Sequence, residues 1–252
     1  MKSASVGFHC PQCLSAHGQR VLSPRDLVRT PVVTVGLIAL NALVFLVDFA
    51  ADSQSSPASS TLDLTSDGLL FGPLVADGEW WRVITSGFLH SSWFHLGSNL
   101  LMLWILGQTL EPTVGRIQFG GIYAASLVAG SVGVLLLDPR APTLGASGAV
   151  FGILGALIVI VRGRGISLTE SGLGPLLVIN LIITFGAPRI SVGGHLGGLA
   201  GGLVLGWVVL TLADAARAGR VDPKMATAAS MAAPWLGAVG LFAAALALAQ
   251  QL

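Results

Sequence analysis

Long runs of apolar residues are the feature that most constrains how this chain can fold. A helix that crosses the hydrocarbon core of a bilayer needs about 20 mostly apolar residues, because no water is present there to bond to the backbone. Seven segments meet or approach this requirement, and the fourth and fifth of them are short. They span approximately residues 32–50, 94–110, 118–137, 147–161, 173–187, 195–213 and 233–250. We therefore predict an all-α fold, a polytopic membrane helical bundle with seven transmembrane helices.

Charged residues fall almost wholly between these segments. They make up 10% of the chain, whereas an average soluble domain contains roughly 25%. The formal net charge is only +1, so the composition gives no reason to expect a nucleic-acid partner. The lipid bilayer is the partner that it predicts.

The positions of Lys and Arg predict the orientation, because basic loops are retained on the cytoplasmic side. If the N-terminus is cytoplasmic, most basic residues fall on the inner side of the membrane. These are Lys2, Arg20, Arg25, Arg29, Arg116, Arg162, Arg164, Arg217, Arg220 and Lys224. The outer side keeps Arg82, Arg140 and Arg189. Two lysines beside eleven arginines favour a GC-rich bacterial source, which would make the compartment the cell membrane.

The same pattern divides the chain into three parts. Residues 1–30 form a short cytoplasmic segment that lacks the apolar core of a signal peptide. Residues 31–213 contain six of the predicted helices and a long outer loop, 51–93, which begins Ser/Pro-rich and ends in an aromatic interfacial segment. Residues 214–252 contain a cytoplasmic linker and the seventh helix.

A few polar side chains lie at the starts of predicted spans two, four and six. Each costs on the order of 2.5–3.5 kcal/mol at the centre of a membrane helix, so its presence needs a reason. They are His90, His95, Asn99, Ser147 and His195. In the predicted topology these helices all begin on the outer side, so the polar groups gather at one depth. Taken singly, such a serine is usually a helix cap and such a histidine is often a partner for a neighbouring helix.

Small residues explain how Ser147 could meet His195. Ser147 follows Gly145 and precedes Gly148, which allow a tight turn into a helix whose first N–H groups would stabilise an oxyanion. Spans four and six each carry small residues at four-residue spacing, which lets helix backbones approach closely. The two stripes are Gly148, Gly152, Ala156 and Gly194, Gly198, Gly202. Packed together, they would place a nucleophile beside a general base.

Other hydrolytic chemistries lack their residues. The acids near the apolar runs lie only at the ends of those runs, which disfavours an aspartyl protease; they are Asp48, Glu111, Asp138 and Asp214. The zinc-protease motif His-Glu-x-x-His is missing. The soluble-hydrolase motif Gly-x-Ser-x-Gly fails because residue 149 is Ala.

Five motifs in this order resemble the rhomboid family of intramembrane serine proteases over about residues 32–213. The motifs are Trp81-Arg82, His90 with His95-x-x-x-Asn99, Glu111 with Gly115-Arg116, Gly145-Ala146-Ser147-Gly148, and His195-x-x-Gly198-x-x-x-Gly202. The resemblance implies that residues 31–213 form a six-helix catalytic core. It also implies that the protein cuts single-span membrane proteins near the outer face, without a metal or organic cofactor.

The resemblance also implies a role for each motif. Ser147 would attack the scissile carbonyl and His195 would take its proton, while His95 and Asn99 would form the oxyanion hole with the Ser147 N–H. The remaining residues would be structural: His90 and Trp81-Arg82 would organise the outer loop, and Glu111 with Arg116 would lock a cytoplasmic helix end. Phe151 stands where some members have a tyrosine, and we expect activity to survive that difference. The seventh span is an addition to the core.

One other functional class stays open at this point. A non-catalytic rhomboid-like protein would bind membrane client helices without cutting them, although such relatives typically lose the serine or the histidine, and this chain retains both. A channel or transporter would be expected to show paired half-repeats and charges near mid-membrane, and the sequence shows neither.

The N-terminal segment contains candidate zinc ligands, Cys10 and Cys13, flanked by His9 and His17. A single Cys-x-x-Cys usually needs a second pair to hold zinc, so the reading without metal also stays open.

Overall fold

The computed structural model describes residues 2–3, 8–9, 30–54, 63–188 and 190–252. The chain divides into two compact units, Met1–Thr30 and Pro31–Leu252. In the first unit, strand β1 (Lys2–Ser3) pairs antiparallel with β2 (Phe8–His9). Cys10 and Cys13, the candidate zinc ligands, lie outside the described residues. Within the described residues no group of three or more His, Cys, Asp or Glu side chains could hold a metal ion.

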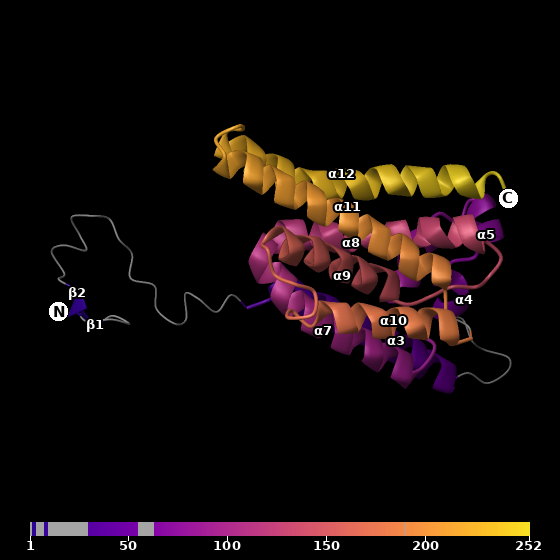
Figure 1. The fold of residues 1–252 in the computed structure, drawn as a ribbon. Coiled ribbons are helices and arrows are strands. Elements are labelled where there is room, and N and C mark those ends of the chain that lie inside the picture. The colour runs from indigo at the N-terminus through magenta and orange to yellow at the C-terminus, as the bar shows by residue number, and fades with distance from the viewer. Residues whose placement is uncertain (1, 4–7, 10–29, 55–62, 189) are drawn as a thin grey trace. The chain divides into compact units, whose positions relative to one another are not determined.

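The second unit is a helical bundle (Figure 1). Its longer helices are α3 (Val32–Gln54), α7 (Trp93–Val114), α8 (Arg116–Leu137), α9 (Ser147–Gly163), α10 (Leu173–Gly186), α11 (Val192–Arg217) and α12 (Pro223–Ala249). Short helices lie between α3 and α7, namely α4 (Leu64–Gly68), α5 (Gly72–Ala76), α6 (Arg82–Thr85) and the 3-10 helix η1 (Ser86–Phe88). The prediction of a helical membrane bundle is confirmed.

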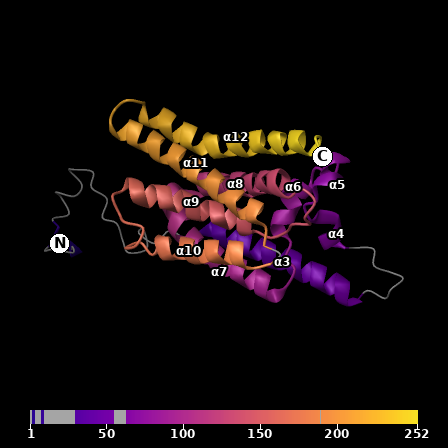
Figure 2. The same ribbon diagram turned by 45° about the vertical axis from the view of Figure 1, so that its right-hand side comes forward.

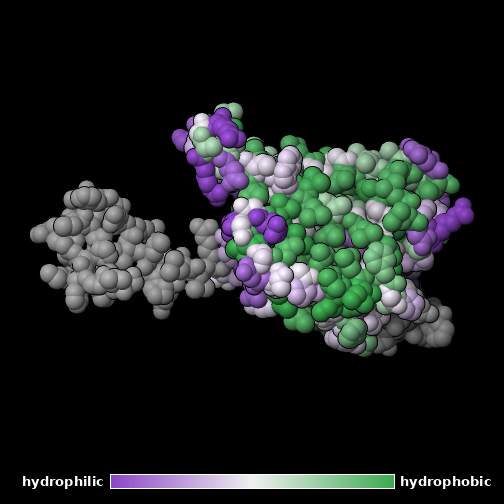
Figure 3. Space-filling model, viewed as in Figure 1, coloured by the Kyte–Doolittle hydropathy of each residue, from purple (hydrophilic) through white to green (hydrophobic). Residues whose placement is uncertain are grey.

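Four helices, α3, α8, α11 and α12, are long and apolar enough to cross a membrane. Helices α9 and α10 are apolar but shorter, as the sequence indicated. Helix α7 has 22 residues but is not among the four, and it carries His95, Asn99 and Glu111 within its length. The prediction of seven spans therefore stays a prediction. Figure 3 shows hydrophobic residues over the middle of one face of the second unit and hydrophilic residues toward its two ends, as a bilayer would require.

Helices α7 and α12 illustrate why helices run beyond the apolar segments that predicted them. Helix α7 continues through Pro112 and ends where Gly115 adopts a φ of +97°, a conformation that favours glycine. Helix α12 begins at Pro223 because Asp222 caps it, accepting hydrogen bonds from the N–H groups of Lys224 and Met225 at 2.8 and 3.1 Å. Hydropathy marks only the lipid-compatible part of a helix, so the approximate span 94–110 stops four residues before the end of α7 and the span 233–250 begins ten residues after the start of α12.

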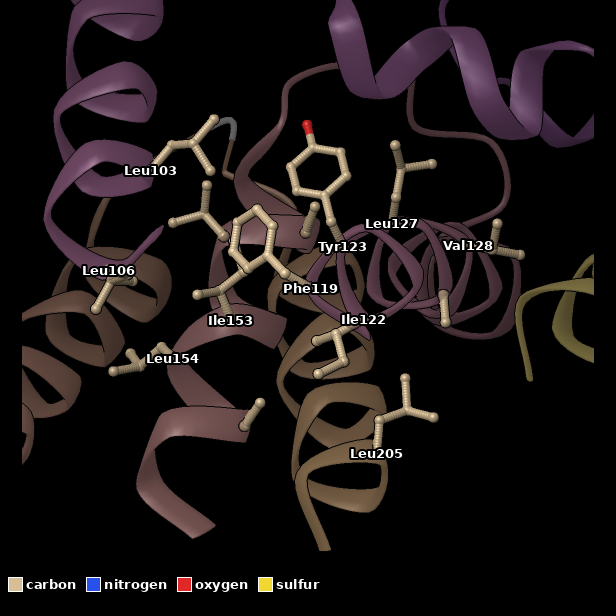
Figure 4. Packing of buried hydrophobic residues seen from close by; sticks show 14 of the residues in the cluster. Leu103, Leu106, Phe119, Ile122, Tyr123, Leu127, Val128, Ile153, Leu154 and Leu205 are labelled. Atoms are coloured by element: carbon tan, nitrogen blue, oxygen red, sulfur yellow. The ribbon is translucent and has the colours of Figure 1, made fainter. Parts of the chain in front are cut away.

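Helix α8 forms the centre of the bundle. It packs against α9, α11 and α12, and 67% of its most apolar stretch is buried, against 11% for α12. Figure 4 shows Phe119 of α8 beside Ile153 of α9, with Leu103 and Leu106 of α7 facing them. Helix α12 runs alongside α8 and α11 in both views (Figures 1 and 2). Helix α12 thus adds to the packing against α8.

Helices α9 and α11 are parallel and touch through their backbones. A Cβ added to Gly198 would overlap the carbonyl oxygen of Gly148, and a Cβ added to Gly202 would overlap that of Gly152. The contacts advance in the same direction along both helices, so both begin at the same end of the bundle. This close approach is what the small-residue stripes predicted.

The carboxylate of Glu111 caps the start of α3. Its oxygens accept hydrogen bonds from the N–H groups of Val33 (3.0 Å) and Thr34 (2.8 Å) and from the Thr34 hydroxyl (2.8 Å). Arg116 lies 4.0 Å away, and its side chain is 63% exposed. The expected lock at this helix end is therefore made chiefly with α3, and Arg116 is a peripheral partner.

Candidate active site

The loop before α9 is held by the segment between α3 and α7. The backbones of Leu70 and Thr143 exchange two hydrogen bonds, of 2.8 and 2.9 Å, and Gly145 N–H donates to the Ser86 carbonyl at 2.8 Å. Gly145 has a φ of +122°, which only glycine adopts without strain. The chain therefore enters α9, and so reaches Ser147, from a fixed direction.

Arg82 organises that supporting segment from within. Its buried guanidinium donates to the carbonyl oxygens of Ser66 (2.7 Å) and Leu69 (2.9 Å), at the end of α4, and pairs with Glu79. The indole of the neighbouring Trp81 donates to the Asp67 carbonyl at 3.1 Å. Both side chains thus satisfy carbonyl groups that the end of a helix leaves free.

Ser147 is the first residue of α9, and its side chain is half-buried. The first hydrogen bond of the helix runs from Val150 N–H to the Ala146 carbonyl, at 3.1 Å. The N–H groups of Ser147, Gly148 and Ala149 consequently have no acceptor within the helix. These donors and the helix dipole make the start of α9 suited to an oxyanion.

His195 lies in the first turn of α11. Ser191 caps this helix by accepting from Gly194 N–H at 3.0 Å, and the imidazole is buried. The ring of Phe151, one turn into α9, stacks on it with centroids 4.2 Å apart and an interplanar angle of 20°. At one edge of the imidazole, Nδ1 lies 2.7 Å from the hydroxyl oxygen of Thr184 in α10.

The ring of His95 lies beside Gly145, in the loop that leads to Ser147. A Cβ added to Gly145 would lie 2.7 Å from both Nε2 and Cε1 of His95 and 3.9 Å from the Ser147 hydroxyl oxygen, so these groups surround one point. The other ring nitrogen, Nδ1, lies 3.4 Å from Ser91 N–H, which can only donate, and 3.2 Å from the Ser91 hydroxyl, which can also donate. An imidazole that accepts at Nδ1 carries its proton on Nε2. His95 therefore presents an N–H donor toward the start of α9.

Asn99 and His90 both contact His95. Asn99 is buried one turn further along α7, and its amide nitrogen donates to the His95 carbonyl at 2.8 Å. That bond uses one of two amide protons and leaves the other free for a second acceptor. The buried ring of His90 contacts the His95 ring edge-on, with centroids 5.1 Å apart.

The structure thus gathers all the polar residues that the sequence singled out at the end of the bundle where α7, α9 and α11 begin. In the described part of the chain no hydrogen bond joins Ser147 to His195. Such bonds are commonly long in enzymes without substrate. Sequence reasoning missed Thr184, which is the one hydrogen-bond partner of the His195 ring among the described residues. The signal that could have found it is a polar pair, Asn180 and Thr184, four residues apart in an apolar stretch of α10.

Residues 77–212 match the family model of the Rhomboid domain. The chain belongs to the rhomboid family. Among rhomboid relatives, it is 38% identical over 176 residues to rhomboid protease GluP of Bacillus subtilis (strain 168), covering 68% of this chain and 34% of GluP. It is 34% identical over 166 residues to RHOMBOID-like protein 5 of Arabidopsis thaliana, covering 62% and 52%.

A third rhomboid relative, Rhomboid-like protease 1 of Toxoplasma gondii, is 27% identical over 212 residues and is covered over 72% of its length. The chain spans about a third of GluP and about half of the Arabidopsis protein. Family membership and the apolar helices together indicate a multi-pass membrane protein whose relatives include named proteases.

Proposed function

We propose that this rhomboid is an intramembrane serine endopeptidase in which Ser147 is the nucleophile and His195 the general base. The observation that carries the proposal is the parallel backbone contact of α9 and α11, made by Gly148 against Gly198. Ser147 and His195 each lie in the first turn of one of these helices. The proposed nucleophile and base therefore lie at the starts of two helices whose backbones touch.

In the proposed reaction the Ser147 hydroxyl attacks the scissile carbonyl carbon while His195 Nε2 takes its proton. The carbonyl oxygen becomes an oxyanion, for which the Ser147 N–H, His95 Nε2–H and the free amide proton of Asn99 are the candidate donors. His195 then gives its proton to the leaving amine as the C–N bond breaks. Water, deprotonated by the same imidazole, hydrolyses the acyl-enzyme and regenerates Ser147.

We place the seven long helices across the bilayer, with the N-terminus in the cytoplasm and the site near the outer face of the cell membrane. The substrate class is then the single-span membrane protein, cut near the outer end of its helix. The exposed apolar side chains around α7 and α10, such as Phe94 at 85% and Ile182 at 65%, would leave the approach to the site lined by groups that a substrate helix can contact.

The test uses the full chain in proteoliposomes with a tagged single-span substrate. Ser147→Ala and His195→Ala should each lower the initial rate by at least about 1,000-fold, because neither half of the pair acts alone. The matched control is Ser171→Ala, whose hydroxyl donates to the Leu168 carbonyl at 3.0 Å and accepts from Leu173 N–H at 3.4 Å. Unchanged cleavage by Ser147→Ala would end the assignment of this pair. Binding of the substrate without any cleavage by the parent protein would favour the non-catalytic, client-binding reading instead.

A further inference from the structure

The Thr184 hydroxyl makes two short contacts inside the bundle. Its oxygen lies 2.7 Å from the Asn180 carbonyl oxygen, one turn back in α10, and 2.7 Å from His195 Nδ1. The Thr184 side chain is 1% exposed, so no bulk water competes for either contact. Its neighbours in the helix, Ile183 and Phe185, are 48% and 64% exposed and face away from the site.

The direction of both hydrogen bonds follows from which groups can donate a proton: the Thr184 hydroxyl, the Asn180 carbonyl or His195 Nδ1. A threonine hydroxyl has one proton to donate, and a carbonyl oxygen can only accept. The contact with Asn180 therefore uses the hydroxyl proton, as in other threonines that bond to the carbonyl four residues back. Toward His195 the same oxygen can only accept. If Nδ1 were unprotonated, one of the two 2.7 Å contacts would set lone pair against lone pair.

We propose that Thr184 is a positioning residue that fixes His195 as the tautomer with its proton on Nδ1. This inference rests on the proposed function, because it leaves the lone pair on Nε2, the nitrogen that would accept the Ser147 proton. With Phe151 stacked on one face of the ring and Thr184 holding one edge, both the tilt and the tautomer of the imidazole are set.

The two histidines of the site are then complementary. Ser91 N–H bonds to Nδ1 of His95 and leaves a donor on Nε2, whereas the Thr184 oxygen bonds to Nδ1–H of His195 and leaves an acceptor on Nε2. The backbone N–H beside His95 and the hydroxyl beside His195 thus give the two imidazoles opposite roles at Nε2, a donor in His95 and an acceptor in His195. A neutral hydroxyl also avoids the cost of burying a carboxylate beside lipid, where an ionised group is expensive unless it is paired.

The kinetic test compares Thr184→Val, which keeps the shape and removes the hydroxyl, with Thr184→Ser, which keeps the hydroxyl. The control is Thr211→Val in α11, because the Thr211 hydroxyl makes the same kind of bond to the carbonyl four residues back, at 2.9 Å, without touching a histidine. In proteoliposomes, Thr184→Val should lower kcat by at least about 10-fold with little change in KM, since general-base catalysis contributes about 100- to 10,000-fold. Thr184→Ser and Thr211→Val should stay within about threefold of the parent.

Two kinetic outcomes would overturn the inference. One is a kcat for Thr184→Val equal to that of Thr211→Val. The other is a Thr184→Ser variant as impaired as Thr184→Val, because that would point to packing of the methyl group and not to the hydroxyl. If Ser147→Ala abolishes cleavage while Thr184→Val is fully active, this inference fails and the proposed function stands.

A second measurement determines the tautomer of His195 directly, in a chain whose Thr184 is unchanged. In the full chain labelled with 15N-histidine, the His195 signals are identified by their loss in His195→Ala. We expect Nδ1 to show the shift of a protonated nitrogen and Nε2 that of an unprotonated one, with the reverse pattern for His95. A His195 protonated on Nε2 alone would overturn the assignment whatever the kinetics show.

Discussion

Phe151 stacks on His195, with ring centroids 4.2 Å apart and planes 20° from parallel. Phe151 is buried in the first turns of α9, and His195 occupies the first turn of α11. The contact therefore fixes the imidazole against the same helix that begins with Ser147. A hydroxyl on this ring is not needed for the stack itself, because the interaction uses the ring face.

The stack predicts how substitutions at Phe151 rank. Phe151→Leu keeps much of the volume and loses the aromatic contact, which is worth about 0.5–1.5 kcal/mol. We expect kcat to fall by about 2- to 10-fold, the equivalent of that energy, whereas Phe151→Tyr should remain close to the parent. Cleavage rates of a tagged substrate in proteoliposomes would measure this. A Phe151→Leu variant as active as the parent would show that the ring does not hold His195.

The backbone contact between α9 and α11 predicts a severe effect at Gly198. A Cβ there would overlap the Gly148 carbonyl, so Gly198→Ala must force the two helices apart, at a cost of about 1–3 kcal/mol for overpacking. Both the unfolding midpoint in detergent and the cleavage rate should fall. Gly36→Ala is the control, since a Cβ at Gly36 meets nothing within 4 Å. Equal stability of the two variants would contradict the packing.

Most of the fold could be predicted from patterns of residue size and hydropathy in the sequence. Long apolar runs predicted the helices because lipid allows few other structures, and the stripes of small residues predicted the contact of α9 with α11 because only small side chains let backbones touch. These signals are periodic and local to one segment. The start of α12 at Pro223 was missed because Pro223, Lys224, Thr227 and Ser230 interrupt the apolar residues in the first part of the helix.

Single polar contacts between distant segments could not be predicted in the same way. Thr34 and Thr184 are ordinary residues of apolar helices, where a threonine usually bonds to its own helix. Nothing in the sequence distinguishes the threonine that also meets Glu111 or His195. The histidines, Asn99 and Ser147 were easier to find because strongly polar groups are rare in such helices and therefore conspicuous.

Replacing Glu111 should lower the stability of the protein more than replacing Arg116. In Glu111→Gln the new amide nitrogen cannot accept, so at least one of the N–H groups of Val33 and Thr34 loses its acceptor. A buried donor left without a partner costs about 1–3 kcal/mol. Arg116→Gln should change stability by less than about 1 kcal/mol, because its side chain is largely exposed. Unfolding midpoints in detergent would separate the two, and equal losses would mean that the ion pair dominates.

The contacts of Arg82 predict that a positive charge at this position is not enough to hold the segment between α3 and α7 in place. Arg82→Lys keeps the positive charge, but a single ammonium cannot reproduce the planar fork that serves Ser66, Leu69 and Glu79 together. Residues 63–92 should become more sensitive to added soluble protease. Cleavage activity should fall several-fold, since the Leu70 backbone in this segment pairs with Thr143 just before α9. Arg140→Lys, at an exposed position, is the control. Protease resistance and activity equal to the parent in Arg82→Lys would mean that the loop is held by its backbone pairing with residues 139–145 and not by the guanidinium.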